Sequence, residues 1–273
     1  MPEIIEAEIT KQKLTLALKG KRILQFETDW PKGLISQKKS VRRTARALKS
    51  SKINRIDRMG KAVVMHLEKD KILAIHQRMS GSVIYDPNRF DFKDKHIHFK
   101  FKMDDGSEFV LLDPRKFGKV WYGSKKWFLE QSYIEGLGPD AMKISNKRFS
   151  SLFGDSSASI KSFLLKQGNI AGLGNIACDE ILWKAGIHPR RKAKDLNKEE
   201  IGNLYESMYT ILASVLKHGG TSMSDWYHPD GKKGRYQRYF RVYNRDFCRR
   251  CRISIAKEKI AGRSTYFCTE CQV

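Results

Sequence analysis

Hydrophobic and polar positions along this chain follow two different periods. Up to about residue 124, short runs rich in β-branched and aromatic residues are separated by turn signals such as DPN (86–88) and DDG (104–106). A period of two is typical of a strand with one buried face. The predicted strands are RILQFETDW (22–30), KAVVMHLE (61–68), KILAIHQRM (71–79), HIHFKFKM (96–103), EFVLLD (108–113) and KVWYG (119–123). Their spacing predicts an antiparallel sandwich or barrel over roughly residues 10–124.

The spacing becomes helical after GLGPDAM (136–142), and this stretch predicts a domain boundary. The predicted helices cover residues 150–167, 175–185 and 196–220. The last has an Asn three residues before a Glu and ends in Gly-Gly, as a capped helix does. At the other end of the chain, Ile4, Ile5 and Ile9 predict a short helix that ends near Thr10. A polar, glycine-bearing loop is expected at 221–237.

The charge of the chain narrows its possible partners. Its 273 residues carry 53 Lys and Arg against 30 Asp and Glu, a formal net charge of +23. An excess of this size calls for an anionic partner: nucleic acid, an anionic membrane or acidic proteins. A membrane is the weakest of these, because no apolar run reaches about 18 residues. No apolar core of a signal peptide is visible either, so the cytoplasm is the expected location, and no signal for an oligomer stands out.

Four of the five cysteines lie near the C-terminal end in two matched pairs. Cys248 and Cys251 form one pair, Cys268 and Cys271 the other, each with two intervening residues. Two such knuckles are typical of a tetrahedral site for one Zn²⁺, and four thiolates indicate a structural metal. Between the pairs, IAKEKIAGRSTYF (255–267) predicts a hairpin with Gly262 and Arg263 at its turn, where Arg263 is suited to contact a groove or phosphates. The fifth cysteine, Cys178, is expected to be a small buried residue.

The first eight residues, MPEIIEAE, contain Pro2, Glu3, Glu6 and Glu8. From the stretch alone, one interpretation is a capped helix, with Pro at its first position and acids at the positive end of its dipole. A chemical interpretation competes with it, and the rest of the chain decides between them.

An ordered set of motifs runs the length of the chain: MPEIIEAE, RMGK (58–61), HQRMSG (76–81), DPRKFG (113–118), GLGNIACDEILWKAGIHP (172–189) and AGRSTYFCTEC (261–271). Together these resemble the formamidopyrimidine-DNA glycosylase and endonuclease VIII family, and the likeness is collinear over essentially the whole chain. The resemblance implies an α+β fold of two domains. A two-layered antiparallel β-sandwich with flanking helices (1–135) precedes a helical helix–two-turn–helix domain with a lesion-capping loop (136–237), and the four-cysteine zinc-finger hairpin (238–273) follows.

The resemblance also implies an activity: a base-excision DNA glycosylase with lyase activity at abasic sites, acting as a monomer on duplex DNA that carries a damaged base. Met1 is removed, the Pro2 nitrogen forms a Schiff base with the sugar, and β,δ-elimination cuts the strand. Glu3 corresponds to the general acid/base, Glu6 to the carboxylate that steadies the opened sugar, and Lys61 to the lysine at the damaged nucleotide. A flipped nucleotide leaves a gap, and the residues that fill it correspond to Met79, Arg115 and Phe117. Phosphate contacts are expected from His76, Lys161, Asn175 and Arg263.

Substrate choice and the chemistry itself leave alternatives. The intact RKFG set and the long loop at 221–237 favour oxidised purines, 8-oxoguanine and formamidopyrimidines, and oxidised pyrimidines are the alternative. Ile5 and Ala7 replace the family's usual Pro and Val, and Ser80 stands where many members have Glu. These departures keep open a protein on the same scaffold that binds damaged or bent DNA without cutting it.

Overall fold

The computed structural model describes residues 2–90, 92, 94–223 and 226–273, so Met1 lies outside the described residues. The chain divides into two compact units. Unit 1 comprises Met1–Glu135 with Gly219–Arg235, and unit 2 comprises Gly136–His218 with Tyr236–Val273. Within the described ranges, no helix has the length and apolar character needed to cross a bilayer.

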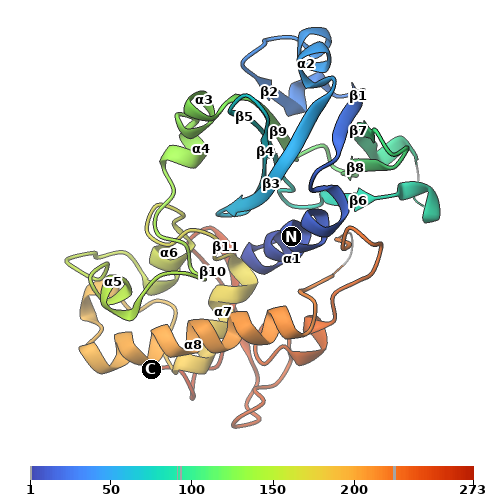
Figure 1. Cartoon of the computed structure of the whole chain (residues 1–273). Helices are drawn as coiled ribbons and strands as arrows, with labels where there is room; N and C mark the ends of the chain where they lie inside the picture. Colours follow the sequence, from blue (N-terminus) through green and yellow to red (C-terminus); the bar gives the residue numbers. More distant parts are fainter. Residues whose placement is uncertain (1, 91, 93, 224–225) are drawn as a thin grey trace. The chain divides into compact units, whose positions relative to one another are not determined.

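Unit 1 is built of strands flanked by helices (Figure 1). Its strands are β1 (Arg22–Thr28), β2 (Leu34–Ser36), β3 (Ser51–Met59), β4 (Ala62–Leu67), β5 (Lys71–His76), β6 (Ser82–Tyr85), β7 (Ile97–Met103), β8 (Glu108–Leu112) and β9 (Lys119–Ser124). Its helices are α1 (Ile4–Leu18), α2 (Val41–Leu48), α3 (Lys125–Leu129) and α4 (Ser132–Glu135). Short 3₁₀ turns occupy 31–33, 87–89 and 94–96.

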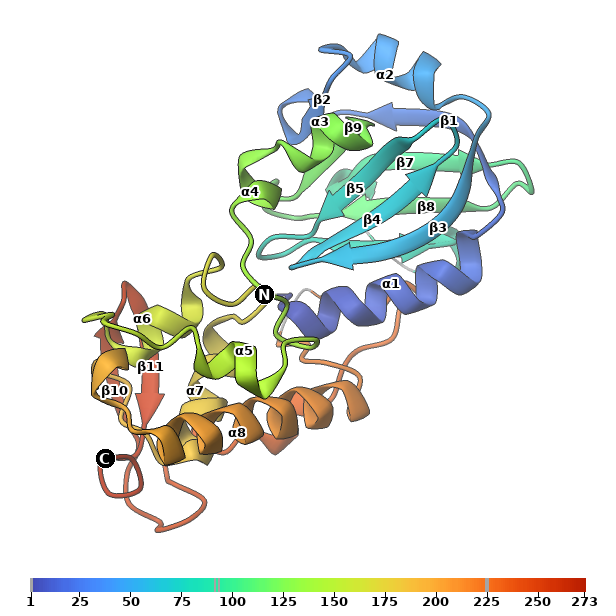
Figure 2. The ribbon, with the colours of Figure 1, turned by 60° about the vertical axis from the view of Figure 1, so that its left-hand side comes forward.

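The strands follow the order β2-β9-β5-β4-β3-β1-β7-β8-β6, and every described neighbour pair except β2 with β9 is antiparallel. β1 and β3 pair only at Arg22 with Lys52 and at Ile23 with Ser51. The sheet therefore turns a corner at that point and forms two layers, which Figure 2 shows with β3, β4 and β5 in front of β7 and β8. Side chains of both layers, among them Met65 and Phe101, belong to one buried cluster. The predicted α+β fold with an N-terminal β-sandwich is confirmed.

The sequence pattern missed β3, whose residues SKINRIDRM alternate poorly. Its pairing with β4 shifts register between Ile53 and Arg55, and this irregularity breaks the period of two. The helix α1 is longer than predicted, because Leu14 and Leu18 continue its buried side at helical spacing beyond Thr10.

Unit 2 contains α5 (Asn146–Ser150), α6 (Ile160–Leu165), α7 (Asn175–Ala185), α8 (Lys198–Lys217) and the hairpin β10 (Ala256–Ile260) with β11 (Arg263–Phe267); 3₁₀ turns lie at 193–195 and 236–239. The predicted cap of α8 is confirmed: Asn197 accepts the N–H of Glu200, and the Glu200 carboxylate accepts the N–H of Asn197. Of the predicted helix 150–167, only α6 forms as a helix inside the range; α5 ends at Ser150, and the segment between them contains Gly154 and a run of small polar residues.

Residues 219–235 differ from the expectation that 136–237 is one domain, because they cluster with unit 1. Hydrogen bonds explain the difference. The Thr221 N–H donates to Glu6 Oε1 at 2.7 Å, the Trp226 indole donates to Gln77 Oε1 at 3.0 Å, and Lys13 pairs with Asp230 at 2.7 Å. We refer to residues 219–235 as the returning segment.

Candidate active site

The N-terminal end of α1 is buried and self-capped. Glu3 is the N-cap, with extended backbone, so Pro2 precedes the helix and does not occupy its first position as the capped-helix interpretation predicted. The Glu3 N–H donates to Glu6 Oε2 at 2.8 Å, and the Glu3 carboxylate accepts the N–H of Glu6 in return. Pro2 itself is buried. Three of the four predicted catalytic residues, Pro2, Glu3 and Glu6, thus lie together at the start of one helix.

The surroundings of Glu6 raise the pKa of its carboxyl group towards neutral pH. Its side chain is 2% exposed. Burial, together with the negative charge of Glu3, raises the pKa of Glu6 to about 6, although the N–H groups of Thr221 and Glu3 oppose the shift. A carboxyl with such a pKa is suited to general acid or base chemistry at physiological pH.

The returning segment folds back on itself through a close backbone approach and contacts this end of α1 through the Thr221 N–H. At Gly234, a Cβ atom would lie 2.3 Å from the Gly220 carbonyl oxygen, so any side chain collides with the backbone. Gly219 and Gly220 both have positive φ, +73° and +78°, a conformation that glycine adopts without strain. Gln77, 1% exposed, links the segment to the helix: it accepts from Trp226 and donates to the Thr10 hydroxyl at 3.1 Å.

A second group of predicted residues gathers around Tyr133. The Lys61 N–H donates to the Tyr133 hydroxyl at 3.1 Å, and the His76 ring lies edge-on to the Tyr133 ring at 4.9 Å. Burial and the positive charges of Arg78 and Lys61 lower the pKa of His76 to about 3. His76 Nδ1 accepts the N–H of Arg78 at 2.9 Å, so the neutral ring carries its proton on Nε2. His76 therefore acts as a neutral hydrogen-bond donor at physiological pH.

The three predicted gap-filling residues lie on two exposed loops. Met79 and Phe117 are large apolar side chains left 40% and 41% exposed, and the Arg115 guanidinium stacks on the Phe117 ring at 4.7 Å. The fully buried Asp113 carboxylate anchors both loops. It accepts the N–H groups of Phe117 at 2.7 Å and Gly118 at 2.6 Å, and the hydroxyl of Ser80, the residue after Met79. The departure at Ser80 thus supplies a bond between the two loops.

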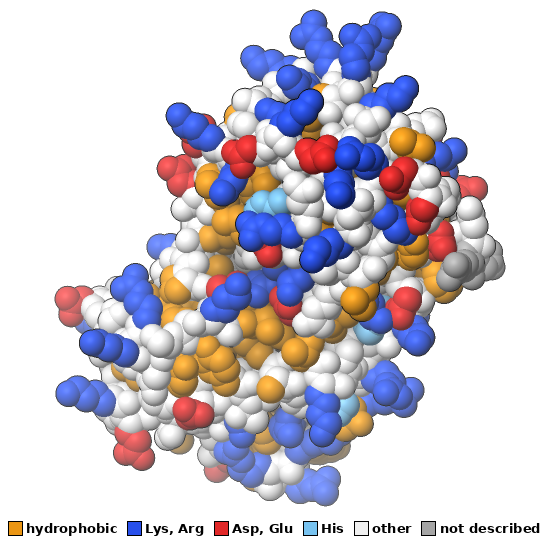
Figure 3. Space-filling view, in the orientation of Figure 1, with side chains coloured by type: hydrophobic (Ala, Val, Ile, Leu, Met, Phe, Trp, Pro, Cys, Tyr) orange, Lys and Arg blue, Asp and Glu red, His pale blue; other side chains and the backbone are white. Residues whose placement is uncertain are grey.

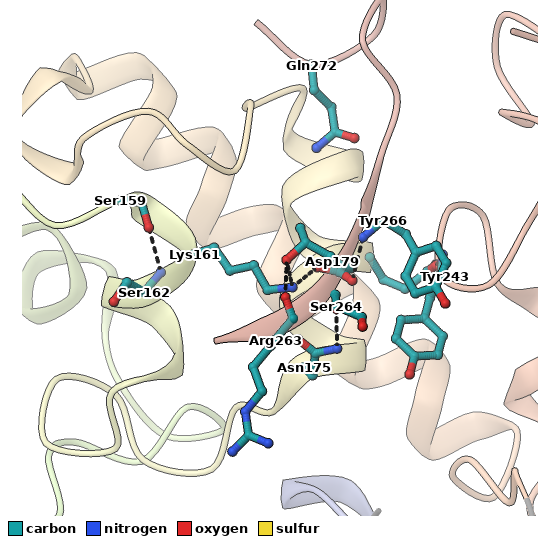
Figure 4. A network of polar contacts seen from close by, with 12 residues as sticks. Ser159, Lys161, Ser162, Asn175, Asp179, Tyr243, Arg263, Ser264, Tyr266 and Gln272 are labelled. Carbon is teal, nitrogen blue, oxygen red and sulfur yellow. Dashed lines mark hydrogen bonds and ion pairs between the residues drawn. The ribbon is translucent and has the colours of Figure 1, made fainter. Parts of the chain in front are cut away.

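In unit 2, the structure gives Lys161 a different place from the expected phosphate contact. Its side chain is fully buried, with Nζ 2.6 Å from Asp179 Oδ1 and 2.7 Å from the Thr265 hydroxyl (Figure 4). Asp179 on α7 and Thr265 on β11 are also buried, so Nζ supplies the positive charge that the carboxylate needs and donates a hydrogen bond to the hydroxyl. Lys161 therefore joins α6, α7 and the hairpin.

Asn175 and Arg263 lie at the edge of this network. Asn175 Nδ2 donates to the Ser264 carbonyl at 2.9 Å, while its buried Oδ1 has no hydrogen-bond partner among the described residues. Arg263 is exposed at the start of β11, and Figure 4 shows its side chain extending away from the network. Of the two, Arg263 offers the more accessible donor to an anion.

The four paired cysteines form a metal site. Their sulfur atoms all lie within 4.8 Å of one another, with Cys248 to Cys271 at 3.8 Å and Cys251 to Cys268 at 3.4 Å. Tetrahedral Zn²⁺ with Zn–S bonds of about 2.3 Å places its sulfurs about 3.8 Å apart, so the cluster fits one structural zinc ion. The Trp183 indole donates to Cys248 Sγ at 3.3 Å, a hydrogen bond that orients a ligand. Cys178 is fully buried in α7, as predicted.

Comparisons with known proteins agree with this architecture. Residues 1–120 match the model of the formamidopyrimidine-DNA glycosylase N-terminal domain, residues 136–226 that of the formamidopyrimidine-DNA glycosylase H2TH domain, and residues 246–273 that of the zinc finger found in FPG and IleRS. A formamidopyrimidine-DNA glycosylase of Shouchella clausii is 34% identical over 278 residues, covering 100% of this chain and 99% of the relative. The chain belongs to the formamidopyrimidine-DNA glycosylase family. As a member of this family, it is a DNA glycosylase of base excision repair.

Solved structures of one relative match over the whole chain. The complex of Lactococcus lactis Fpg with DNA containing an abasic site is 31% identical, with a TM-score of 0.88 and 99% coverage of both chains. Complexes of the same Lactococcus protein with DNA containing Fapy-dG and with DNA containing an oxidised pyrimidine give TM-scores of 0.87 and 0.88 at the same identity and coverage.

Several residues around the candidate site were not predicted from the sequence. Asp113 opens the DPRKFG motif, and its position before a proline was a usable turn signal. Tyr133, Gln77 and Trp226 carried no such signal, because their importance depends on contacts between segments far apart in the chain.

Proposed function

We propose that this glycosylase removes oxidised purines from duplex DNA and then cuts the strand at the resulting abasic site. The observation that carries the proposal is the buried cluster of Pro2, Glu3 and Glu6 at the start of α1, with the pKa of Glu6 raised to about 6. The expected setting is the cytoplasm, with the protein acting as a monomer on damaged duplex DNA.

The reaction starts from an amine. Once Met1 is removed, the Pro2 nitrogen is a secondary α-amino group, and such groups have a reference pKa of about 7.7–8.0, so a useful fraction is unprotonated at neutral pH. The nitrogen forms a bond to the sugar C1′ as the C1′ bond to the damaged base breaks, and the base leaves with that electron pair and takes up a proton. The C1′–O4′ bond then breaks, and Glu3 carries the proton lost from the Pro2 nitrogen to O4′. The product is an iminium between Pro2 and the opened sugar.

Strand cleavage follows from the iminium. It acidifies the C2′ hydrogen, so loss of that proton expels the 3′ phosphate, and a second elimination expels the 5′ phosphate. Glu6 holds the opened sugar, and Lys61 lies at the damaged nucleotide. No oxidant or reductant enters, because both steps are eliminations.

The remaining proposed site residues have two roles: some fill the gap that the flipped nucleotide leaves in the duplex, and the others contact the DNA backbone. Met79, Arg115 and Phe117 fill the space that the flipped nucleotide leaves, which suits two exposed apolar side chains and a stacked guanidinium. His76, Asn175 and Arg263 contact phosphates. We assign Lys161 a positioning role, because it fixes β11, and with it Arg263, against α6 and α7. In this proposal, residues 1–135 together with the returning segment serve catalysis, 136–218 serve DNA binding, and 238–273 form the zinc hairpin.

The lesion class is proposed from the RKFG set and from the returning segment that covers the start of α1. Oxidised pyrimidines are the second candidate, since the Lactococcus relative has been crystallised with both kinds of lesion. Single-turnover excision from duplexes that carry 8-oxoguanine or thymine glycol distinguishes them. Faster release of thymine glycol would overturn the assignment to purines.

Borohydride trapping on a lesion-bearing duplex tests the chemistry. The wild-type protein is expected to become covalently attached to DNA, while Pro2→Gly is expected to lose most of its trapping and excision. Pro31→Gly, at an exposed position of unit 1, is the matched control and is expected to react normally. Intact-mass measurement should find Met1 absent. Binding of damaged duplex without trapping would favour the non-catalytic alternative.

A further inference from the structure

The segment around α2 carries a run of positive charge that no acidic residue interrupts. Between Asp29 and Asp57 there are nine Lys or Arg and no Asp or Glu. The exposed members nearest the helix are Lys38, Lys39, Arg42, Arg43, Arg46 and Lys49, and we call these six residues the α2 patch. Figure 3 shows Lys and Arg side chains gathered at the top of the view, where Figure 1 places α2. Within the described parts of the chain, no member of the α2 patch forms an ion pair with a carboxylate.

Packing explains the apolar positions of α2 but not its arginines. Thr44 and Leu48 are the buried residues of α2. Ser40 caps the helix by accepting the N–H of Arg43 at 3.1 Å. Arg42 and Arg43, however, lie in the first turn, where the helix dipole disfavours cations. Arg42 and Arg46 are also like charges four residues apart, an arrangement that destabilises a helix.

Another helix of the chain has the opposite arrangement of charge. The long helix α8 has Glu199 and Glu200 in its first turn and Lys217 in its last. A local charge arrangement that costs helix stability, on an exposed surface, indicates selection for contact with an anion.

The α2 patch matches duplex DNA better than an acidic protein. A helix of eight residues is about 12 Å long, and a duplex presents about seven phosphates over that length. Protein interfaces are built around buried aromatic and aliphatic anchors, but none of the exposed large hydrophobic residues of the described chain lies within residues 31–52.

The patch is remote from the proposed reaction centre within unit 1. Figures 1 and 2 both place α2 at the end of the sandwich away from the N-terminal end of α1. We propose that the α2 patch binds a second segment of duplex DNA while the active site holds the first, so that the protein passes directly between segments. This inference requires DNA binding but not the proposed lesion or chemistry.

Transfer kinetics test the proposal. The protein is loaded on a labelled duplex of about 15 base pairs, one and a half helical turns, that contains an abasic-site analogue. Its dissociation is then measured against increasing unlabelled undamaged duplex. Direct transfer makes the dissociation rate constant rise in proportion to competitor concentration. In the variant R42Q/R43Q/R46Q, which keeps helix propensity and removes three phosphate contacts, we expect that dependence to fall at least about fivefold.

The control variant is K147Q/K194Q/K198Q, which removes three exposed positive charges from unit 2 and should keep the full dependence. Excision from the short duplex in a single turnover should stay within about twofold of wild type for both, because neither variant touches the proposed site. If R42Q/R43Q/R46Q unfolds at a lower temperature than the wild-type protein, K38Q/K39Q/K49Q tests the same patch at positions outside the helix.

Three results of the DNA competition overturn the proposal: dissociation of the wild-type protein that is independent of competitor, an unchanged dependence in the α2 variants, or an equal loss in the control. Poly-glutamate at equal charge should leave dissociation unchanged; acceleration by poly-glutamate in place of DNA would assign the patch to an acidic protein. If the wild-type protein and all variants fail to excise the lesion, but the wild-type protein still transfers between duplexes, the proposed function is contradicted and this inference is supported.

Discussion

At the scale of single residues, this protein uses burial to set the protonation of its polar groups. Glu6 and His76 are both nearly inaccessible to water, and burial disfavours the charged form of each. The consequence has opposite signs: the pKa of the carboxyl rises to about 6, and that of the imidazole falls to about 3. At neutral pH the site therefore holds a carboxyl that can still exchange a proton and a histidine that is a fixed neutral donor.

Glu6 predicts a pH dependence of stability. Its pKa is about 6 in the folded protein against an ordinary value of 4.5, so between these values the folded state holds a proton that the unfolded chain has released. The wild-type protein therefore loses stability as pH rises through this window. A shift of this size corresponds to about 2 kcal/mol. The free energy of unfolding of Glu6→Gln minus that of wild type should increase by about 2 kcal/mol from acidic to mildly alkaline pH.

Urea unfolding at a series of pH values measures this difference. Glu206→Gln, on the exposed side of α8, is the control for removing a carboxylate without burial. A difference between Glu6→Gln and wild type that stays constant with pH would show that Glu6 titrates as a solvated carboxylate, against this prediction.

At the scale of elements, unit 2 is held together by interactions that tie α6, α7 and the terminal hairpin to one another. The buried pair of Lys161 and Asp179 joins all three, since Nζ also binds Thr265 on β11 and Asp179 Oδ2 accepts the N–H of Tyr266 at 3.1 Å. The zinc cluster closes the same hairpin from its other end. An ion pair of this kind specifies geometry more than it adds stability, because both charges are desolvated.

Breaking the pair on one side should be costly. Lys161→Met leaves the Asp179 carboxylate buried without its cation and should lower the free energy of unfolding by about 3–5 kcal/mol. The double variant K161M/D179N removes both charges, and its amide oxygen still accepts from Tyr266, so it should recover more than half of that loss. Equilibrium urea unfolding followed by tryptophan fluorescence measures both. Equal destabilisation of the single and double variants would contradict a desolvated ion pair.

Removal of zinc should release the hairpin. Zinc binding free energy is folding free energy in small sites of this kind, so chelation or Cys268→Ser is expected to unfold β10 and β11 and to weaken DNA binding through loss of Arg263. Cys178→Ser, at a buried cysteine outside the cluster, is the matched control for the loss of a thiol. Metal content and duplex affinity are the measurements, and full affinity in metal-free protein would exclude a structural metal.

At the scale of the whole molecule, charge dominates association with DNA. The 53 Lys and Arg outnumber the 30 Asp and Glu, which leaves a net charge of +23. Binding of a polyanion to such a surface releases condensed counterions. The same excess speeds the encounter with DNA and makes it sensitive to salt.

Affinity for duplex should therefore fall steeply with ionic strength. If the protein neutralises about six to ten phosphates, raising salt from about 50 mM to 200 mM should weaken binding by roughly 10³–10⁵. Pro2→Gly should show the same salt slope as wild type, because it removes no cation that contacts phosphate. The two slopes are measured by fluorescence anisotropy. A slope near zero would show that the charge serves another purpose.

The sequence by itself determined those features that depend on near neighbours along the chain. The two cysteine pairs, each with a two-residue gap, indicated the zinc site, because each pair is a local unit that is typical of zinc ligands. Asn197 and Glu200 specified the cap of α8, because that structure closes within a few residues. The alternating strands of unit 1 were recognised for the same reason, whereas β3 was missed where its register shifts. The motif order was sufficient to indicate the family.

Only the tertiary structure decided the burial, the hydrogen-bond partners and the pKa of each polar group. The pKa of Glu6 depends on Thr221, 215 positions away, and on the returning segment that joins unit 1. Lys161 was expected on a phosphate and is instead enclosed with Asp179 and Thr265, a partner 104 positions along the chain. Burial and charge in a folded protein are set by segments remote in sequence, and no local pattern records which segments meet.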